Sequence, residues 1–210
     1  MSNVNPELVE LFRTKAAVVG AKVVEAASMA EAARYVADVC ASKDPCELLA
    51  DEPDAEQGPL GPNKVPTRVK RIVAAPDLDA AAFGALAGDC EAKGFACIKE
   101  GLRKHLAGID VGVAQAVLGV ADSGTCMVNS DDEETRLATM ISEISVLILH
   151  KSAIRKDLPS IAADLRAQQS TGKPSYTAFI TGPSRTADIE RVSAIGVHGP
   201  LELHIILLED

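Results

Sequence analysis

The sequence predicts an α/β fold with a mostly parallel β-sheet covered by helices on both faces. Short apolar runs rich in β-branched residues, such as 71–75, 95–99 and 145–150, alternate with segments of helical spacing. Strands that alternate with helices are typical of parallel sheets, because each crossover helix packs on a face of the sheet. A hydrophobic content of 47% is enough to fill the core of one domain of 210 residues.

The composition excludes several classes of protein. Aromatic residues make up 3% of the chain and Trp is absent, so the core must consist mostly of aliphatic side chains. A net charge of −9 argues against a nucleic-acid partner or an anionic membrane surface. No apolar run reaches transmembrane length and residues 1–10 lack a signal-peptide pattern, so we expect no membrane insertion and a cytoplasmic location.

The cysteines do not indicate a cofactor. Their odd number and wide spacing argue against a disulfide framework, and no Cys-x-x-Cys pair is present for iron–sulfur ligation. A metal site that combines two of them with a His is the less favoured alternative, because the ligand spacing is missing. Dinucleotide and Walker-type glycine motifs are also absent, so we expect no cofactor and no metal in this chain. The five cysteines are Cys40, Cys46, Cys90, Cys97 and Cys126.

The N-terminal part predicts a helix over 4–17, a short strand over 21–24 and a second helix that ends near residue 41. Ser28 with Glu31 three residues later forms a capping box at the start of that second helix. The elements expected further along the chain are a helix from Asp77 or Asp79 to 93, a helical turn over 102–107, a short helix followed by a strand over 111–121, a turn over 122–125, a strand over 126–128 and helices over 131–141 and 157–172.

Residues 42–70 differ in character from the rest of the single domain that we expect over 1–210. This segment contains five Pro and an acidic group, which predicts a flexible loop. Two interpretations stay open. It is either a solvated loop or a functional segment, a lid or a docking arm for a partner, because long structureless loops in compact domains are often functional.

The C-terminal stretch predicts a small-anion site. A strand over 176–180 ends at Gly182-Pro183, Ser184 stands at an N-cap position, and a helix is expected over 185–195. Gly196 would end the helix, a turn follows over 197–200, and a last strand is expected over 201–208. A helix N-terminus offers unpaired amides and a positive dipole to an anion, and Arg185 adds a full charge.

Two motifs carry a resemblance to a known family. TGPSRTADIE followed by GVHGPLELHIILLED, together with GVAQAVLGVADSGTCMV at 112–128, resembles the LUD-domain family, in the lactate utilisation protein C group. The resemblance implies the three-layer, Rossmann-like sandwich of the CoA transferases and ribose-5-phosphate isomerases. It also implies a subunit of the system that oxidises L-lactate to pyruvate, in which partner subunits hold the iron–sulfur clusters.

In open α/β sheets, ligands bind outside the carboxyl ends of the strands. The glycine turns at Gly124, Gly182 and Gly199 are therefore expected at that edge, around a small carboxylate or phosphate. The 122–125 turn could instead bond only its own backbone, and Arg185 with Asp188 could form a surface ion pair. The expected ligand-binding residues are Asp122, Ser123, Gly124, Thr125, Gly182, Pro183, Ser184, Arg185, Thr186, Asp188, His198 and Gly199.

Catalytic residues are not identified by the sequence, and the candidates are His198 and Glu143. His198 stands beside the expected anion site, where an imidazole could exchange protons. His204 alternates with apolar neighbours and is expected to be a strand residue. The chain departs from the family pattern where Ser142 and Ser145 replace a proline-like and a histidine-like position.

Three functions are compatible with this reading. The first is a cluster-free subunit of a lactate-oxidising complex, the second a stand-alone isomerase or CoA-transferase-like enzyme, and the third a carboxylate-binding regulatory module. Fold alone does not separate them. Co-purification with iron–sulfur proteins would favour the complex subunit, and turnover by the lone chain would favour the stand-alone enzyme. Ligand binding without either result would favour the regulatory module. A homo-oligomer is compatible with all three functions.

Overall fold

The computed structural model describes residues 4–43, 70–105, 108–170, 175–188, 192–195 and 199–210. The helices are α1 (Pro6–Val18), α2 (Met29–Ser42), α3 (Ala80–Ala92), α4 (Glu133–Ile141) and α5 (Ala162–Gln169), with short 3-10 turns at Leu102–His105, Lys151–Ala153 and Pro159–Ile161. The strands are β1 (Lys22–Ala26), β2 (Ile72–Ala74), β3 (Ala96–Ile98), β4 (Val111–Ala116), β5 (Leu118–Val120), β6 (Thr125–Asn129), β7 (Ile144–His150), β8 (Ile154–Arg155), β9 (Thr177–Ile180), β10 (Arg185–Asp188), β11 (Val192–Ile195) and β12 (Glu202–Leu208).

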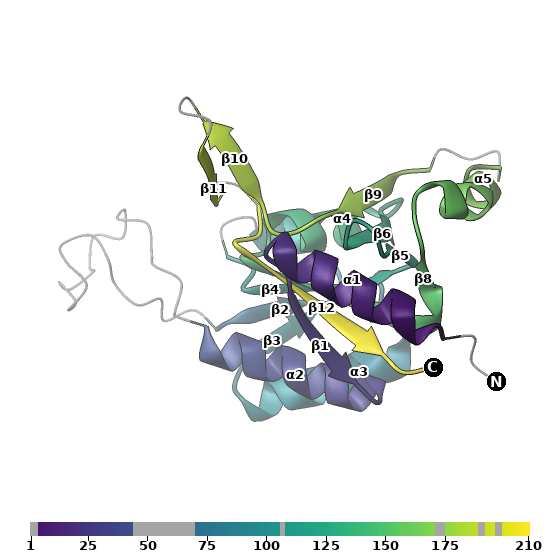
Figure 1. The fold of residues 1–210 in the computed structure, drawn as a ribbon. Helices are drawn as coiled ribbons and strands as arrows, with labels where there is room; N and C mark the ends of the chain where they lie inside the picture. The colour runs from purple at the N-terminus through teal and green to yellow at the C-terminus, as the bar shows by residue number, and fades with distance from the viewer. Residues whose placement is uncertain (1–3, 44–69, 106–107, 171–174, 189–191, 196–198) are drawn as a thin grey trace.

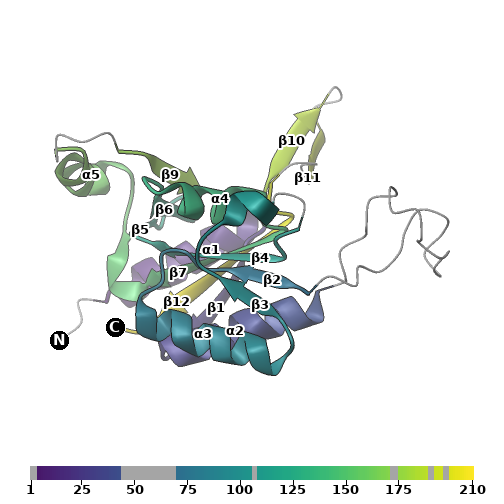
Figure 2. The same cartoon turned by 180° about the vertical axis from the view of Figure 1, so that it is seen from behind.

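A six-stranded parallel sheet forms the centre of the molecule, with the strand order β1-β12-β7-β4-β2-β3. Helices α2 and α3 cover one face, whereas α1, α4 and a second sheet cover the other (Figures 1 and 2). The second sheet has the order β8-β5-β6-β9, and β10 and β11 form a separate hairpin. The predicted α/β fold with a mostly parallel sheet covered on both faces is therefore confirmed.

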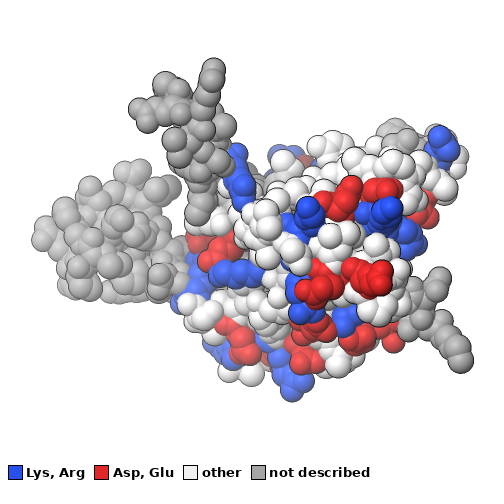
Figure 3. Space-filling model, in the orientation of Figure 1, with Lys and Arg blue, Asp and Glu red and all other residues white. Residues whose placement is uncertain are grey.

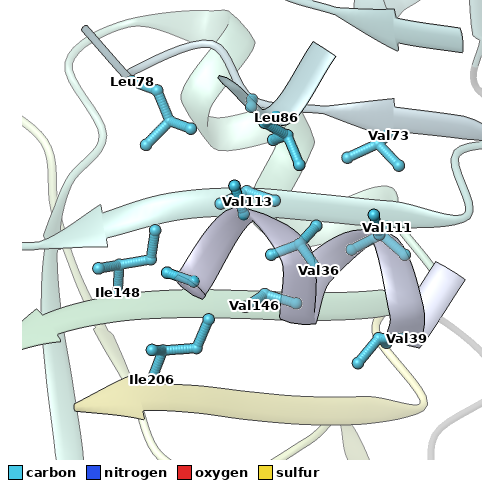
Figure 4. Close-up of a cluster of buried hydrophobic side chains, with 14 of the residues drawn as sticks. Val36, Val39, Val73, Leu78, Leu86, Val111, Val113, Val146, Ile148 and Ile206 are labelled. Atoms are coloured by element: carbon cyan, nitrogen blue, oxygen red, sulfur yellow. The ribbon is translucent and has the colours of Figure 1, made fainter. Parts of the chain in front are cut away.

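The two faces of the sheet have separate cores because successive side chains of a strand point to opposite sides. Val146 and Ile148 of β7 face α2 and α3, where they pack with Val36 and Val113 (Figure 4). Leu147, which lies between them in the sequence, belongs to the core under α1, together with Phe12, Leu149, Ile205 and Leu207, among others. Burial on both faces explains why β7 and β12 are almost continuous apolar runs.

Several predicted caps are present. Ser28 accepts a hydrogen bond from the Glu31 amide at 3.3 Å, and the Glu31 carboxylate accepts one from the Ala27 amide at 2.8 Å. The Glu31 side chain therefore bonds the amide of Ala27, one residue before the Ser28 amide that a capping box uses. Asp79, rather than Asp77, caps α3, and Asp132 caps α4. These local contacts set the starts of the helices before any tertiary packing is considered.

The expected short helix within 111–121 is wrong, because this segment forms the strands β4 and β5. A short apolar run does not distinguish a helix from a buried strand by its period. The glycines here serve close packing instead. A Cβ at Gly112 would overlap the carbonyl oxygen of Ala138, and one at Gly119 would overlap the side chain of Leu149. The absence of side chains lets α4 and the core approach the strands.

The expected helix over 185–195 is also wrong. Residues Arg185–Asp188 and Val192–Ile195 form the antiparallel strands β10 and β11, with Arg185 opposite Ile195. This hairpin extends away from both sheets (Figure 1). A helix of this length gains most of its stability by packing an apolar face on a core, and here none is beside it. The expected flexible loop lies, for its residues 44–69, outside the described part of the chain.

Figure 3 shows acidic and basic side chains intermixed over the face that carries α1 and α2. None of the helices described is long and apolar enough to cross a membrane.

Candidate functional site

A cavity of about 500 Å³ lies at the amino ends of β7 and β12, between α4 and β9. Ser145 and Leu203, the second residues of β7 and β12, line it from the sheet. Arg136, Thr139 and Met140 line it from α4, and residues of β9 line it from the opposite side. The size is within the range of about 300–1,000 Å³ that is common for small-molecule sites.

Two buried serine hydroxyls in this cavity have no hydrogen-bond partner among the residues that the structure describes. Ser130 and Ser145 are each only 1% exposed, and each Oγ is unpaired. An unsatisfied buried polar group costs about 1–3 kcal/mol, so such groups are uncommon in native proteins. A bound polar molecule would supply the missing partners.

Arg136 brings a positive charge to the same cavity. Its Nη1 donates to the carbonyl oxygens of Ser130 at 2.5 Å and Asp131 at 2.9 Å. The guanidinium carbon also lies 5.8 Å from the centre of the Tyr176 ring, a cation–π distance. These contacts fix the orientation of the side chain. The hydrogen bonds that Arg136 donates to described residues all come from Nη1.

The main chain around the cavity is held by close packing and by hydrogen bonds. Gly112 lets α4 lie directly on β4, and Ser142 Oγ donates to the Ala138 carbonyl at 2.8 Å at the end of that helix. Across the cavity, the Ser184 amide donates to Pro200 O at 2.9 Å, which joins the segment after β9 to the segment before β12. Gly182 has φ +72° and lies against the Val19 carbonyl, where a side chain would clash.

Part of the residue set expected from the sequence lines this cavity, namely Gly182, Pro183, Ser184 and Gly199. The turn at 122–125 lies next to it. Ser123 Oγ is 2.8 Å from Thr125 Oγ1, which is 2.7 Å from Thr181 Oγ1, and Thr181 precedes Gly182. Gly124 packs against the backbone of α1, and the Asp122 amide donates to the Lys156 carbonyl at 3.0 Å.

Arg185 lies outside the cavity lining and donates from Nη2 to the carbonyl of Val19, the residue that ends α1. Because 185–188 is a strand, the expected helical i, i+3 arrangement of Arg185 and Asp188 is wrong. Thr186 and Asp188 pair with Ala194 and Val192 in the hairpin, and their side chains are outside the description. His198 is also outside the described residues, as is Gly196.

Glu143, the other catalytic candidate, belongs to a charged cluster at the amino end of β7. Its Oε2 is 2.7 Å from Lys43 Nζ, which is 3.1 Å from Asp110 Oδ1. Asp110 Oδ2 accepts a hydrogen bond from the Ile72 amide at 2.7 Å. The Lys43 and Asp110 side chains are buried, so this cluster joins the end of α2 to the strand ends.

Charged side chains lie at the carboxyl ends of the strands. Lys151, directly after β7, forms ion pairs with Glu25 at 2.7 Å and with Glu209. Further along this edge, Asp77 Oδ2 accepts a hydrogen bond from the Gln115 amide at 2.7 Å, whereas its buried Oδ1 has no partner among the described residues. Burial raises the pKa of this carboxyl group. The turns at Gly182 and Gly199 lie instead by the amino ends of β7 and β12, so their expected place at the carboxyl edge is wrong.

His204 is a strand residue, as expected, and lies in a hydrogen-bonded chain. Its Nδ1 is 2.8 Å from Tyr35 Oη, its Nε2 is 2.9 Å from Glu202 Oε2, and the same oxygen is 2.6 Å from Lys22 Nζ. Burial lowers the pKa of the His204 imidazole, although the Glu202 carboxylate acts in the opposite direction. Every polar atom of the imidazole thus has a partner.

Sequence reasoning missed Ser130, Arg136 and Tyr176 as cavity residues. One signal for Ser145 was available, since a serine interrupts the apolar run ISVLI of a buried strand. For Arg136 and Tyr176, which meet only in the folded chain, no local signal exists. Among the described residues, no group of three His, Cys, Asp or Glu side chains could hold a metal ion.

Comparison with known proteins identifies the family. The model of the LUD domain matches residues 9–208. The chain is 37% identical over 102 residues to the uncharacterized protein YkgG of Escherichia coli (strain K12) and 35% identical over 103 residues to lactate utilization protein C of Geobacillus thermodenitrificans (strain NG80-2). Each match covers 48% of this chain, and 44% and 43% of those relatives, so the chain spans less than half of their length in these matches.

A solved structure supports the fold. A DUF162 family protein from Deinococcus radiodurans superposes with a TM-score of 0.56 and 15% sequence identity, over 96% of both chains. This likeness at low identity concerns the architecture only. Together with the family match over nearly the whole length, it shows that the chain belongs to the LUD domain family.

Proposed function

We propose that this chain is a component of a lactate-utilisation system, holds no iron–sulfur cluster itself, and binds a small carboxylate in the cavity at the amino ends of β7 and β12. The observation that carries the proposal is that Ser130 and Ser145, whose buried hydroxyls have no partner among the described residues, line the same cavity as Arg136. The names of several relatives, lactate utilization protein C, supply the chemical class of the ligand.

The three groups match the chemistry of a hydroxy or oxo acid. A carboxylate has two oxygens that accept hydrogen bonds, and the serine hydroxyls and the Arg136 guanidinium donate. Hydrogen bonds to charged groups contribute about 1.5–3 kcal/mol each, more than those between neutral groups. Binding would also remove the cost of the two unsatisfied hydroxyls.

In this proposal the chain binds and orients the acid, and partner subunits with iron–sulfur clusters accept the electrons. Glu143, the exposed member of the charged cluster at the same end of the sheet, contributes to the surface for such a partner in this proposal. Cytoplasmic location and assembly with other subunits are further parts of the proposal. The sequence supports the first, and the resemblance to the lactate utilisation protein C group supports the second.

Calorimetric titration of the purified chain with L-lactate, pyruvate and phosphate tests the binding step. We expect Ser145→Ala and Arg136→Ala to weaken carboxylate binding about tenfold or more, since a charge-assisted hydrogen bond of 1.5–3 kcal/mol corresponds to that factor. Ser170→Ala, on an exposed hydroxyl outside the cavity, is the matched control. Binding that is unchanged in both cavity variants would contradict the proposed site.

Arg185→Ala separates the cavity from the anion site expected from the sequence. Arg185 bonds the end of α1, so we expect its loss to change carboxylate affinity by less than about twofold, which is under 0.5 kcal/mol. A tenfold loss in Arg185→Ala with no loss in Arg136→Ala would place the ligand beside Arg185, outside the cavity.

The complex is tested separately. A pull-down from the native host should retain proteins that contain iron and reduce a dye when lactate is added. A preparation that binds lactate but retains no iron would support a regulatory module, and turnover by the lone chain would support a stand-alone enzyme.

A further inference from the structure

The cavity is much larger than the acid suggested by the relatives' names. Its volume of about 500 Å³ suits a ligand of drug-like size. Lactate and pyruvate contain only three carbons, so either would leave most of the cavity to water. Water in apolar surroundings with few polar partners is unfavourable.

Most of the lining is apolar. Ile180, Pro183 and Leu203 contribute aliphatic surface inside the cavity. Three more residues of the lining are large hydrophobic side chains that remain exposed, namely Met140 at 58%, Tyr176 at 56% and Phe179 at 44%. Exposed apolar side chains grouped at a cavity are a feature of binding sites, because a ligand removes that surface from water.

The polar and apolar groups are arranged side by side on α4. Arg136 and Met140 are four residues apart, so they lie on the same face of the helix, and both line the cavity. A ligand whose carboxylate reaches Arg136 would therefore extend its carbon chain along Met140. Phe179 of β9 and Leu203 of β12 offer apolar contacts from two other elements.

We propose that the cavity binds an α-hydroxy acid with a large apolar side chain, or the corresponding α-oxo acid, in preference to lactate and pyruvate. This inference rests on the proposed carboxylate site and specifies its substrate class. The serines and Arg136 hold the polar end, as they would for lactate. The apolar lining then selects for length, because each buried methylene contributes about 0.8 kcal/mol, or roughly fourfold in affinity.

A titration series tests the preference. The probes are L-lactate, α-hydroxybutyrate, α-hydroxyisocaproate and phenyllactate, each measured by calorimetry on the purified chain. Three added carbons should tighten binding of α-hydroxyisocaproate by about 50-fold relative to lactate. Isocaproate, which lacks the α-hydroxyl group, controls for non-specific apolar binding and should bind more weakly than its hydroxy derivative.

A variant that fills the cavity provides the second test. Ala178 has the smallest side chain in the β9 part of the lining, so Ala178→Phe should weaken the long acids about tenfold while lactate changes less than about twofold. Val117→Phe, at an exposed position outside the lining, is the matched control. Ala178→Leu replaces the first variant if thermal unfolding shows that the larger ring prevents folding.

The outcomes separate this inference from the proposed function. Lactate binding that is as tight as that of the longer acids overturns the preference and leaves the carboxylate site intact. No binding of any of the four acids overturns the proposed site, and the preference with it. Tight binding of the long acids that Ser145→Ala leaves unchanged would show that they bind elsewhere, which also overturns the inference.

Discussion

The two ends of β7 and β12 use polar residues in opposite ways. At the carboxyl ends, buried Lys151 pairs with Glu25 and Glu209, so its charge is compensated. At the amino ends, the buried hydroxyls of Ser145 and Ser130 have no partner among the described residues, and both residues line a cavity of about 500 Å³. The same two strands therefore end in a closed ion-pair cluster on one side and in an open, unsatisfied site on the other.

For β7 and β12, hydrogen-bond accounting and the position expected from the fold point to opposite ends of the strands. Parallel α/β sheets commonly bind ligands at their carboxyl ends, which is where the sequence led us to expect the pocket. A charge that is already paired offers little to a ligand. A buried hydroxyl without a partner costs free energy until a ligand arrives, so it marks a site more directly.

The largest effect is expected from Gly112→Val. This substitution disturbs only the amino ends of the strands, so it tests that side of the sheet separately from the carboxyl ends. Its side chain would overlap the Ala138 carbonyl, so α4 must shift, and Arg136 with it. We expect a loss of about 3 kcal/mol in the free energy of unfolding and loss of carboxylate binding. Urea denaturation and calorimetry measure both. Gly84→Ala is the control: its Cβ meets nothing within 4 Å in the middle of α3, so it should stabilise by about 0.5–1 kcal/mol.

Lys151→Met probes the carboxyl end. Removing the ammonium leaves Glu25 and Glu209 without this partner, but both carboxylates are about half exposed and can be hydrated. We expect a cost of about 1–2 kcal/mol, less than the 3–5 kcal/mol seen when a fully buried charge is left alone. Carboxylate affinity should stay the same. If Lys151→Met abolished binding while its unfolding remained cooperative, the ligand would belong at the carboxyl end.

Ser145→Ala tests the cost of the unsatisfied hydroxyl in the unliganded protein. Because the Oγ has no partner among the described residues, its removal breaks no hydrogen bond with them and relieves a buried polar group. We expect the melting temperature to stay the same or rise, with a stability gain of at most about 1 kcal/mol. A loss of more than 1 kcal/mol would mean that the hydroxyl has a structural partner, and the contrast between the two ends would weaken.

Acidification should destabilise the protein through His204. The side chain of His204 lies on the opposite face of the sheet from that of Leu203. Burial lowers the pKa of His204 below its usual 6.5, so below that pH the unfolded chain binds more protons than the folded one. Stability therefore falls as the pH drops through this region. The lowered pKa of Glu202, due first to its hydrogen bond with His204, adds a further loss below about pH 4.5.

Urea midpoints between pH 7.5 and 5.5 measure this effect, which His204→Gln should reduce. Because His204 is not part of the cavity lining, carboxylate affinity per folded molecule should not follow the same pH profile. A shared profile for stability and affinity would link His204 to the site at the amino end.

The sequence by itself determined the sheet, its two apolar cores and most of the helix starts. Val146 and Leu147 alternate between faces through the strand period alone, and Ser28, Asp79 and Asp132 cap helices through bonds to amides within three residues. Such features depend on neighbours along the chain. They are therefore visible in an isolated sequence.

Only the tertiary structure decided the hairpin at 185–195 and the composition of the cavity. The described part of the hairpin extends away from both sheets, and its strand pairing replaces the helix suggested by Ser184. The cavity joins Ser130, Arg136, Ser145 and Tyr176 from four separate elements and loops. Whether a serine hydroxyl is satisfied depends on atoms that are distant in the sequence, so no local pattern could have shown that these two were left without partners.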